Sequence, residues 1–191
     1  MDKIGVLALQ GDFEEHIHAL LKASEKLSVP IKIVEVRTAS HLDGIDGLII
    51  PGGESTAISR LMQSEGMFEK IASVRKIMGT CAGAILLAKE VHGATHFQRF
   101  LSIMDISVTR NAYGSQLASF EAQITTVFGS MNGVFIRAPK LQPISPEVQP
   151  MAFLSEEVVG AYQKLKDQHL IALAFHPELT TTKFHEYFIK L

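Results

Sequence analysis

Several features are scarce in this chain of 191 residues, and each scarcity excludes a class of protein. Cys81 is its one cysteine, so it can form neither an internal disulfide nor a multi-cysteine zinc or iron–sulfur site. The formal net charge is −2 at pH 7, which leaves no electrostatic basis for binding nucleic acid.

Long apolar runs are also missing. Residues 84–88 are far shorter than the roughly 20 residues that span a bilayer, and residues 4–9 are too short for the core of a signal peptide. We therefore expect a cytoplasmic protein that has neither a membrane nor a nucleic acid as its partner.

The composition that remains is typical of an ordered globular protein. Hydrophobic residues make up 47% of the chain and charged residues 20%. A chain of this length buries roughly 70% of the surface that its unfolded state exposes, so it needs no disulfide to fold. We find no repeat, low-complexity tract or linker, and we expect residues 1–191 to form a single domain.

Short apolar runs alternate with helical patterns over the first half of the chain. We expect strands over residues 3–9, 31–36, 47–50 and 76–79, and helices over 13–26, 56–62 and 82–90. Asp12, three residues before Glu15, is expected to cap the first helix. Strands that alternate with helices indicate a parallel sheet with helices on both faces.

The pattern changes after about residue 95. Further strands are expected over 103–109, 121–128, 133–136, 151–154, 158–163 and 170–175, followed by a last helix with apolar residues at i, i+3, i+4 and i+7. The proline-rich residues 139–150 are expected to form a rigid surface loop. The fold class is therefore α/β: a single three-layer, flavodoxin-like domain whose mostly parallel central sheet carries an added antiparallel portion.

Cys81 lies in the segment Gly79-Thr80-Cys81-Ala82-Gly83, the cysteine form of the G-x-S-x-G motif. A sharp turn between a strand and a helix exposes such a nucleophile, and the flanking glycines remove side chains that would collide. The start of the helix stabilises a thiolate and leaves the N–H of Ala82 free to face an oxyanion. Free cysteines are most often buried and inert, so a small residue at a tight turn is the alternative.

A thiolate nucleophile needs a base, and the base needs an orienting group. His176 ends the expected strand 170–175 and is followed by Pro177 and Glu178. Proline keeps the preceding residue extended, so Glu178 is expected on the same side as His176, where it accepts a hydrogen bond from one ring nitrogen. The other nitrogen is then left for Cys81. A surface turn is the alternative for this tripeptide.

The other histidines point less clearly to a function. His16 and His18 lie two residues apart on an expected helix, and we expect them at the surface or facing a partner. His92 and His96 have the i, i+4 spacing of helical metal ligands, but Gly93 lies between them and no third ligand is evident. We therefore expect no metal site.

The segment Pro51-Gly52-Gly53-Glu54-Ser55-Thr56 follows the expected strand 47–50. Its glycines let backbone N–H groups approach a ligand closely, and one could donate to an oxyanion; a purely structural turn is the alternative. The segment lacks the G-K-[ST] ending of a phosphate-binding loop. Ligands of open α/β sheets bind beyond the carboxyl ends of the strands, so this segment, residues 10–11 and residues 79–83 mark the expected site.

The chain resembles the class I, triad-type glutamine amidotransferases through residues 79–83 and His176-Pro177-Glu178. Within them, it is similar to the glutaminase subunits of pyridoxal 5'-phosphate synthase over residues 5–11, 51–56, 110–114, 135–139 and 175–179. These blocks span nearly the whole chain. One departure is Ser115, which stands where many members of that family have an arginine.

The resemblance implies hydrolysis of L-glutamine to L-glutamate and ammonia, without a cofactor. It implies that the ammonia passes to a separate synthase subunit in a large hetero-oligomer, which residues 11–18 and the loops around the site would face. Cys81 would be the nucleophile, His176 and Glu178 the relay, and the N–H groups of Gly53 and Ala82 the oxyanion donors. The implied glutamine pocket comprises Gly53, Glu54, Ser55, Arg110, Ile136 and Arg137.

Other interpretations remain open at this point. Arg110 and Arg137 suit the substrate carboxylate, but each could instead form a structural ion pair with a surface acid. The chain could be a cysteine-elbow hydrolase of the DJ-1 type, a binding module that has lost catalysis, or the glutaminase of another synthase. Measuring ammonia release from glutamine separates these alternatives.

Overall fold

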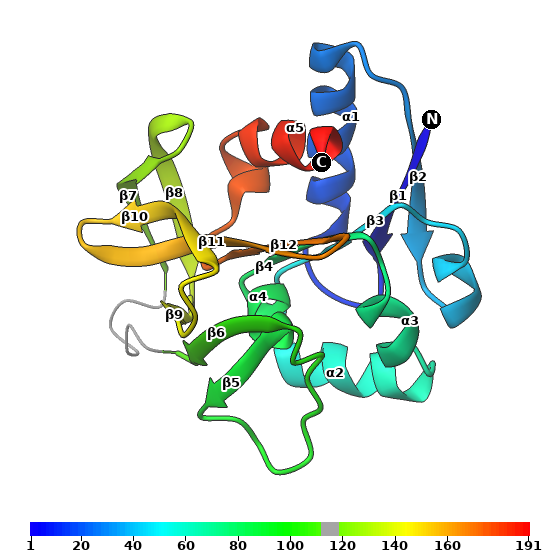
Figure 1. The fold of residues 1–191 in the computed structure, drawn as a ribbon, viewed down its shortest axis with the longest axis horizontal. Coiled ribbons are helices and arrows are strands. Elements are labelled where there is room, and N and C mark those ends of the chain that lie inside the picture. Colours follow the sequence, from blue (N-terminus) through cyan, green and yellow to red (C-terminus); the bar gives the residue numbers. More distant parts are fainter. Residues whose placement is uncertain (112–118) are drawn as a thin grey trace.

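Nine strands form one mixed sheet in the computed structural model, which describes residues 1–111 and 119–191 (Figure 1). Five neighbouring strands are parallel to one another: β2 (Ile31–Val36), β1 (Asp2–Leu7), β3 (Gly47–Ile50), β4 (Lys76–Thr80) and β12 (Gln168–Leu173). The other four continue the sheet in antiparallel order: β11 (Glu157–Leu165), β10 (Val148–Leu154), β7 (Ser119–Thr126) and β8 (Gly129–Ile136).

Helices cover both faces of the parallel strands, as Figure 1 shows. On one face, α1 (Phe13–Leu27) packs against α5 (Lys183–Lys190), and on the other lie α2 (Ser55–Ser64), α3 (Phe68–Ala72) and α4 (Ala82–Leu87). Two short 3₁₀ helices complete the set, η1 (Ala39–Leu42) and η3 (Pro177–Leu179). The expected single α/β domain is confirmed. None of the helices in the described ranges is long and apolar enough to cross a membrane.

The burial of the strands explains their arrangement. Every residue of β3 and β4 is buried, as are four consecutive residues of β1 and of β12. Strands without a polar face need helices on both sides, which is the environment of a parallel sheet. The helix α1 buries Ala19, Leu20 and Ala23 along the stripe that faces the sheet and α5.

The helix predicted over residues 82–90 is too long. α4 ends at Leu87, and Ala88 has the extended backbone angles φ −65° and ψ 140°. Residues 88–92 form β5 (Ala88–His92), which pairs in parallel with β6 (Met104–Thr109) in a second, three-stranded sheet. All six residues of α4 are buried, so no polar face marks where the helix ends.

The rigid loop predicted over residues 139–150 is also wrong. Residues 140–143 form β9 (Lys140–Pro143), and β10 already begins at Val148. β9 pairs with β6 at the edge of the three-stranded sheet. Proline cannot donate a ladder hydrogen bond, but it is tolerated in edge strands, and Pro143 is the last residue of β9.

Lys76 is a buried lysine at the start of β4. Its Nζ atom donates to Asp2 Oδ2 at 2.8 Å and to the carbonyl oxygen of Ile189 at 3.2 Å, and it lies 5.5 Å from the centre of the Phe188 ring. The Lys76 ammonium therefore connects β4 with β1 and with α5.

We expect Lys76→Met to lower the free energy of unfolding by about 1–3 kcal/mol, because it leaves the Ile189 carbonyl without this donor and Asp2 without its hydrogen-bonded cation. Urea unfolding measures the change. Lys32→Met, at an exposed position on β2, is the matched control and should change stability by less than about 0.5 kcal/mol. Equal losses in the two variants would contradict a specific role for the buried ammonium.

Candidate active site

A cleft of about 450 Å³ opens beyond the carboxyl ends of the parallel strands. It lies where β1, β3 and β4 end, as expected for an open α/β sheet. The residues of the expected site that line it are Gly53, Glu54, Ser55, Cys81, Arg110, Ile136, Arg137 and His176. Segments from both halves of the chain therefore meet in one cavity.

Cys81 occupies a strained turn between β4 and α4. Its backbone angles are φ 48° and ψ −103°, and its N–H donates to the carbonyl oxygen of Leu173 on β12 at 2.8 Å. The flanking glycines leave no room for a side chain: a Cβ atom at Gly83 would lie 2.1 Å from the Ile50 carbonyl oxygen, and one at Gly79 would lie 2.5 Å from the Gly83 backbone. Strain of this kind is typical of nucleophile turns.

The thiol of Cys81 is buried at the base of the cleft. The residue is 6% exposed, and Sγ lies 3.7 Å from the carbonyl oxygen of Ile136. Ala82 follows directly as the first residue of α4, so the thiol stands at the start of that helix. The turn thus presents one sulfur atom to the cavity and shields it from bulk solvent.

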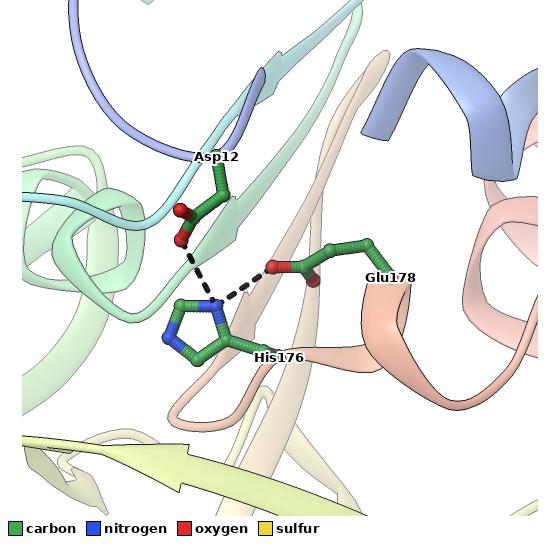
Figure 2. Close-up of side chains that lie close together, drawn as sticks. All are labelled: Asp12, His176 and Glu178. Carbon is green, nitrogen blue, oxygen red and sulfur yellow. Dashed lines mark hydrogen bonds and ion pairs between the residues drawn. The ribbon is translucent and has the colours of Figure 1, made fainter. Parts of the chain in front are cut away.

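Two carboxylates, those of Asp12 and Glu178, approach the same ring nitrogen of His176 (Figure 2). Its Nδ1 atom lies 2.7 Å from Glu178 Oε1 and 3.4 Å from Asp12 Oδ2, and its backbone N–H donates to the Val134 carbonyl oxygen at 2.9 Å. The backbone differs from the expected extended form, because η3 begins at Pro177. The expected hydrogen bond between His176 and Glu178 forms all the same, across the first turn of this 3₁₀ helix.

The neighbours of His176 determine its protonation. Burial lowers the pKa of the ring, but the hydrogen bond with Glu178 and the nearby Cys81 and Glu178 charges outweigh burial and raise the pKa to about 10. The imidazole therefore carries a proton on both nitrogens at neutral pH. The cleft therefore holds a buried thiol and a protonated imidazole that is oriented by a carboxylate.

We expect Cys81→Ala to lower the pKa of His176 from about 10, because the nearby Cys81 raises this pKa while burial continues to lower it. NMR titration of the ¹⁵N-labelled imidazole in the two proteins measures the change. The resonances of histidines distant from the thiol serve as internal controls and should keep their titration curves. An unchanged His176 titration would contradict the pairing with Cys81.

Glu54 and Arg110 form one wall of the cleft. The Glu54 carboxylate caps α2 by accepting from the N–H groups of Thr56 and Ala57 at 3.1 and 2.6 Å. Burial raises the pKa of Glu54, but these two N–H groups outweigh it and hold the pKa below the usual value. Arg110 Nη2 lies 3.5 Å from Glu54 Oε1, so the ion pair considered as an alternative for Arg110 is present within the cleft itself.

Sequence reasoning missed Gln98, which organises this wall. Its Oε1 atom accepts from Arg110 Nη1 at 2.9 Å, and its Nε2 atom donates to Ser55 Oγ at 3.0 Å. No motif or periodicity marks Gln98, because it lies in an irregular segment between β5 and β6. The sequence marks Gln10 only as the end of a strand. In the structure, its Oε1 atom accepts a hydrogen bond from the Glu54 N–H at 2.8 Å.

Two predictions about the segment that follows β1 are wrong. Asp12 makes no side-chain capping hydrogen bond on α1, and its carboxylate turns toward His176 instead. His16 is fully buried rather than at the surface, because α5 covers this side of α1 and brings His185 against it. His18, two residues on, is exposed as predicted.

Asp12, His176 and Glu178 place three potential metal-ligand atoms within 4.8 Å of one another. Both carboxylates converge on the same ring nitrogen, Nδ1, which favours hydrogen bonding over metal binding. Among the described residues, His92 and His96 belong to no such group. Ser115 and residues 112–114 of the predicted motif lie outside the described residues.

Comparisons with known proteins agree with this geometry. The chain is 50% identical over 196 residues to "Pyridoxal 5'-phosphate synthase subunit PdxT" of Pyrococcus horikoshii, a match that covers 98% of each chain. The protein of the same name from Oenococcus oeni is 45% identical over 99% of this chain and 96% of its own. A crystal structure titled as a glutamine amidotransferase superposes with a TM-score of 0.84 at 40% identity, over 98% of this chain and 97% of that one.

The model of the family described as "SNO glutamine amidotransferase family" matches residues 6–191, a range that includes Cys81, His176 and Glu178. The match covers four of the five parallel strands in full, the strained turn after β4 and the His-Pro-Glu segment. This chain therefore belongs to the SNO glutamine amidotransferase family.

Proposed function

We propose that this chain is the glutaminase subunit of a pyridoxal 5'-phosphate synthase and releases ammonia from L-glutamine by means of Cys81. The observation that supports it most strongly is geometric: His176, hydrogen-bonded to Glu178 at 2.7 Å, lines the same cleft as the Cys81 thiol on its strained turn. Family membership and the names of the relatives support the same reaction and the same partner.

In the first half of the reaction, the Cys81 thiolate attacks the side-chain amide carbon of glutamine. The developing oxyanion is held by the N–H groups of Gly53 and Ala82, which belong to the glycine segment and to the start of α4. His176 then gives its proton to the departing nitrogen, and ammonia leaves behind a γ-glutamyl thioester on Cys81.

In the second half, water attacks the thioester carbon. His176, now neutral, takes a proton from this water, and glutamate leaves as Cys81 returns to the thiolate. Glu178 keeps Nδ1 of His176 protonated, so that Nε2 is the atom that moves the proton in both halves. Asp12 offers a second carboxylate to the same nitrogen at 3.4 Å.

The wall of the cleft supplies the substrate contacts. Arg110 is held by Glu54 and Gln98, and its guanidinium would pair with the α-carboxylate of glutamine. Glu54 carries the negative charge that suits the α-amino group, and Ser55, Ile136 and Arg137 complete the lining. The side-chain amide then reaches Cys81 at the base of the cavity.

The experiment that tests this function is the release of glutamate and ammonia from glutamine by the purified protein, with and without the synthase subunit of the same organism. We expect turnover in the complex and less in the isolated chain. If a confirmed complex with intact Cys81 releases neither product, the glutaminase function is wrong.

A further inference from the structure

Behind Glu178 lies a buried pair of histidines that the proposed mechanism does not use. His16 on α1 and His185 on α5 are both fully buried, and His16 Nδ1 lies 3.0 Å from His185 Nε2. The other ring nitrogen of His16, Nε2, lies 3.0 Å from Thr80 Oγ1 and 3.4 Å from Glu178 Oε2. His16 thus touches the residue before the nucleophile and the residue that orients His176.

The contacts determine which nitrogen of each ring carries the proton. His185 Nδ1 is buried without a hydrogen-bond partner in the described part of the chain, and a buried lone pair is tolerated better than a buried unpaired N–H. His185 therefore carries its proton on Nε2 and donates to His16 Nδ1. His16 must then carry its own proton on Nε2.

This tautomer turns an N–H group of His16 toward Thr80 and Glu178. The opposite tautomer would bring a ring lone pair within 3.4 Å of a carboxylate oxygen, which is repulsive. Glu178 Oε2 is itself buried and has no hydrogen-bond partner among the described residues, so the positive edge of the His16 ring is a close source of stabilisation for it. Both arguments place the proton of His16 on Nε2.

His16 also stays neutral. Burial, followed by the charges of His185 and His176, lowers the pKa of His16 well below its usual value, and burial alone lowers the pKa of His185 to about 3. A neutral donor can hold the second oxygen of Glu178 without taking the charge that Glu178 offers to His176.

We propose that His16 is a positioning residue for Glu178: its neutral Nε2–H, fixed in that tautomer by His185, donates to Thr80 Oγ1 and turns its positive edge toward Oε2, so that Oε1 stays on His176. The inference rests on the proposed glutaminase function and extends it to residues on α1 and α5. His16 does not line the cleft, so it acts on the site indirectly; its contact with Thr80 is a second route, which the Glu178→Gln background separates from the route through Glu178.

The test is a double-mutant cycle on the complex with the synthase subunit, read by glutamate release. We expect His16→Leu to lower kcat about tenfold with KM changed less than twofold, as for other residues that orient a catalytic group. His16→Gln can place an amide N–H near the same position and should recover most of the loss. In a Glu178→Gln background, His16→Leu should lower kcat less than twofold, because the residue through which it acts is already altered.

Equal losses from His16→Leu in both backgrounds would show a merely structural role and overturn the proposal, as would a loss confined to KM. His92→Leu, an exposed histidine outside the site, is the matched control and should leave kcat unchanged. Thermal unfolding of each variant identifies global destabilisation.

A second readout does not depend on glutamine turnover. The pH profile of Cys81 alkylation by iodoacetamide reports the thiolate–imidazolium pair directly, and His16→Leu should shift it while His16→Gln restores it. An inactive wild type would contradict the glutaminase function, whereas an active wild type with an unshifted alkylation profile in His16→Leu would overturn this inference alone.

Discussion

Cys81→Ala is expected to lower glutamine hydrolysis by the complex at least about 10³-fold, because removal of a covalent nucleophile leaves only binding and oxyanion contacts. Coupled measurement of glutamate formation determines the residual rate. The structure predicts that this variant folds: alanine and cysteine both carry a Cβ atom, so the strained φ of 48° costs about the same in each.

Cys81→Ser is the companion variant, since it preserves the shape of the side chain and replaces sulfur by a much weaker nucleophile at neutral pH. It should lose as much activity as Cys81→Ala while still binding glutamine. A Cys81→Ser protein with wild-type turnover would contradict the covalent mechanism and would require another nucleophile in the cleft.

Gly83→Ala is expected to have the largest effect on stability, about 3 kcal/mol or more, because its new methyl group meets backbone rather than a movable side chain. The Cβ atom would lie 2.1 Å from the Ile50 carbonyl oxygen, so either β3 or the start of α4 must shift. Urea unfolding of the isolated chain measures the loss.

Gly66→Ala is the matched control for this prediction. Gly66 has a left-handed φ of 63° but no atom near its Cβ position, so this substitution tests backbone strain without a collision and should cost only about 1 kcal/mol. If the two variants lost the same stability, close packing at the turn would not be the reason for the glycine at position 83.

Much of the parallel half of the fold could be predicted from the sequence because each strand is a short apolar run next to a clear turn. The predicted limits of residues 31–36 and 47–50 match β2 and β3, and the turn that holds Cys81 lies between a strand and a helix, as predicted. The limits of these strands and the position of this turn depend on residues that are close together in the sequence. The hydrogen bond between His176 and Glu178 is local too, since the two residues are separated by only one proline.

Features that depend on distant packing could not be predicted in this way. His16 shows helical spacing with polar neighbours, and only the arrival of α5 from the far end of the chain makes its position buried. Asp12 fits a helix cap by its type and spacing, yet the carboxylate turns toward a ring 164 positions later in the sequence. Alanine, lysine and glutamate at 88–90 favour a helix, but pairing with β6 outweighs that preference.

The pairing of β12 with β4 has a consequence for how the enzyme becomes reactive. His169 pairs with Lys76 across this ladder, so strands more than ninety residues apart must meet before His176 reaches Cys81. Non-local strand pairing of this kind is slow relative to the formation of local turns and helices. During synthesis Cys81 emerges long before His176, the base that we propose for it, so the two side chains come together only when β12 pairs with β4. In the proposed mechanism, the return of glutaminase activity during refolding therefore times this strand pairing, rather than the collapse of the chain.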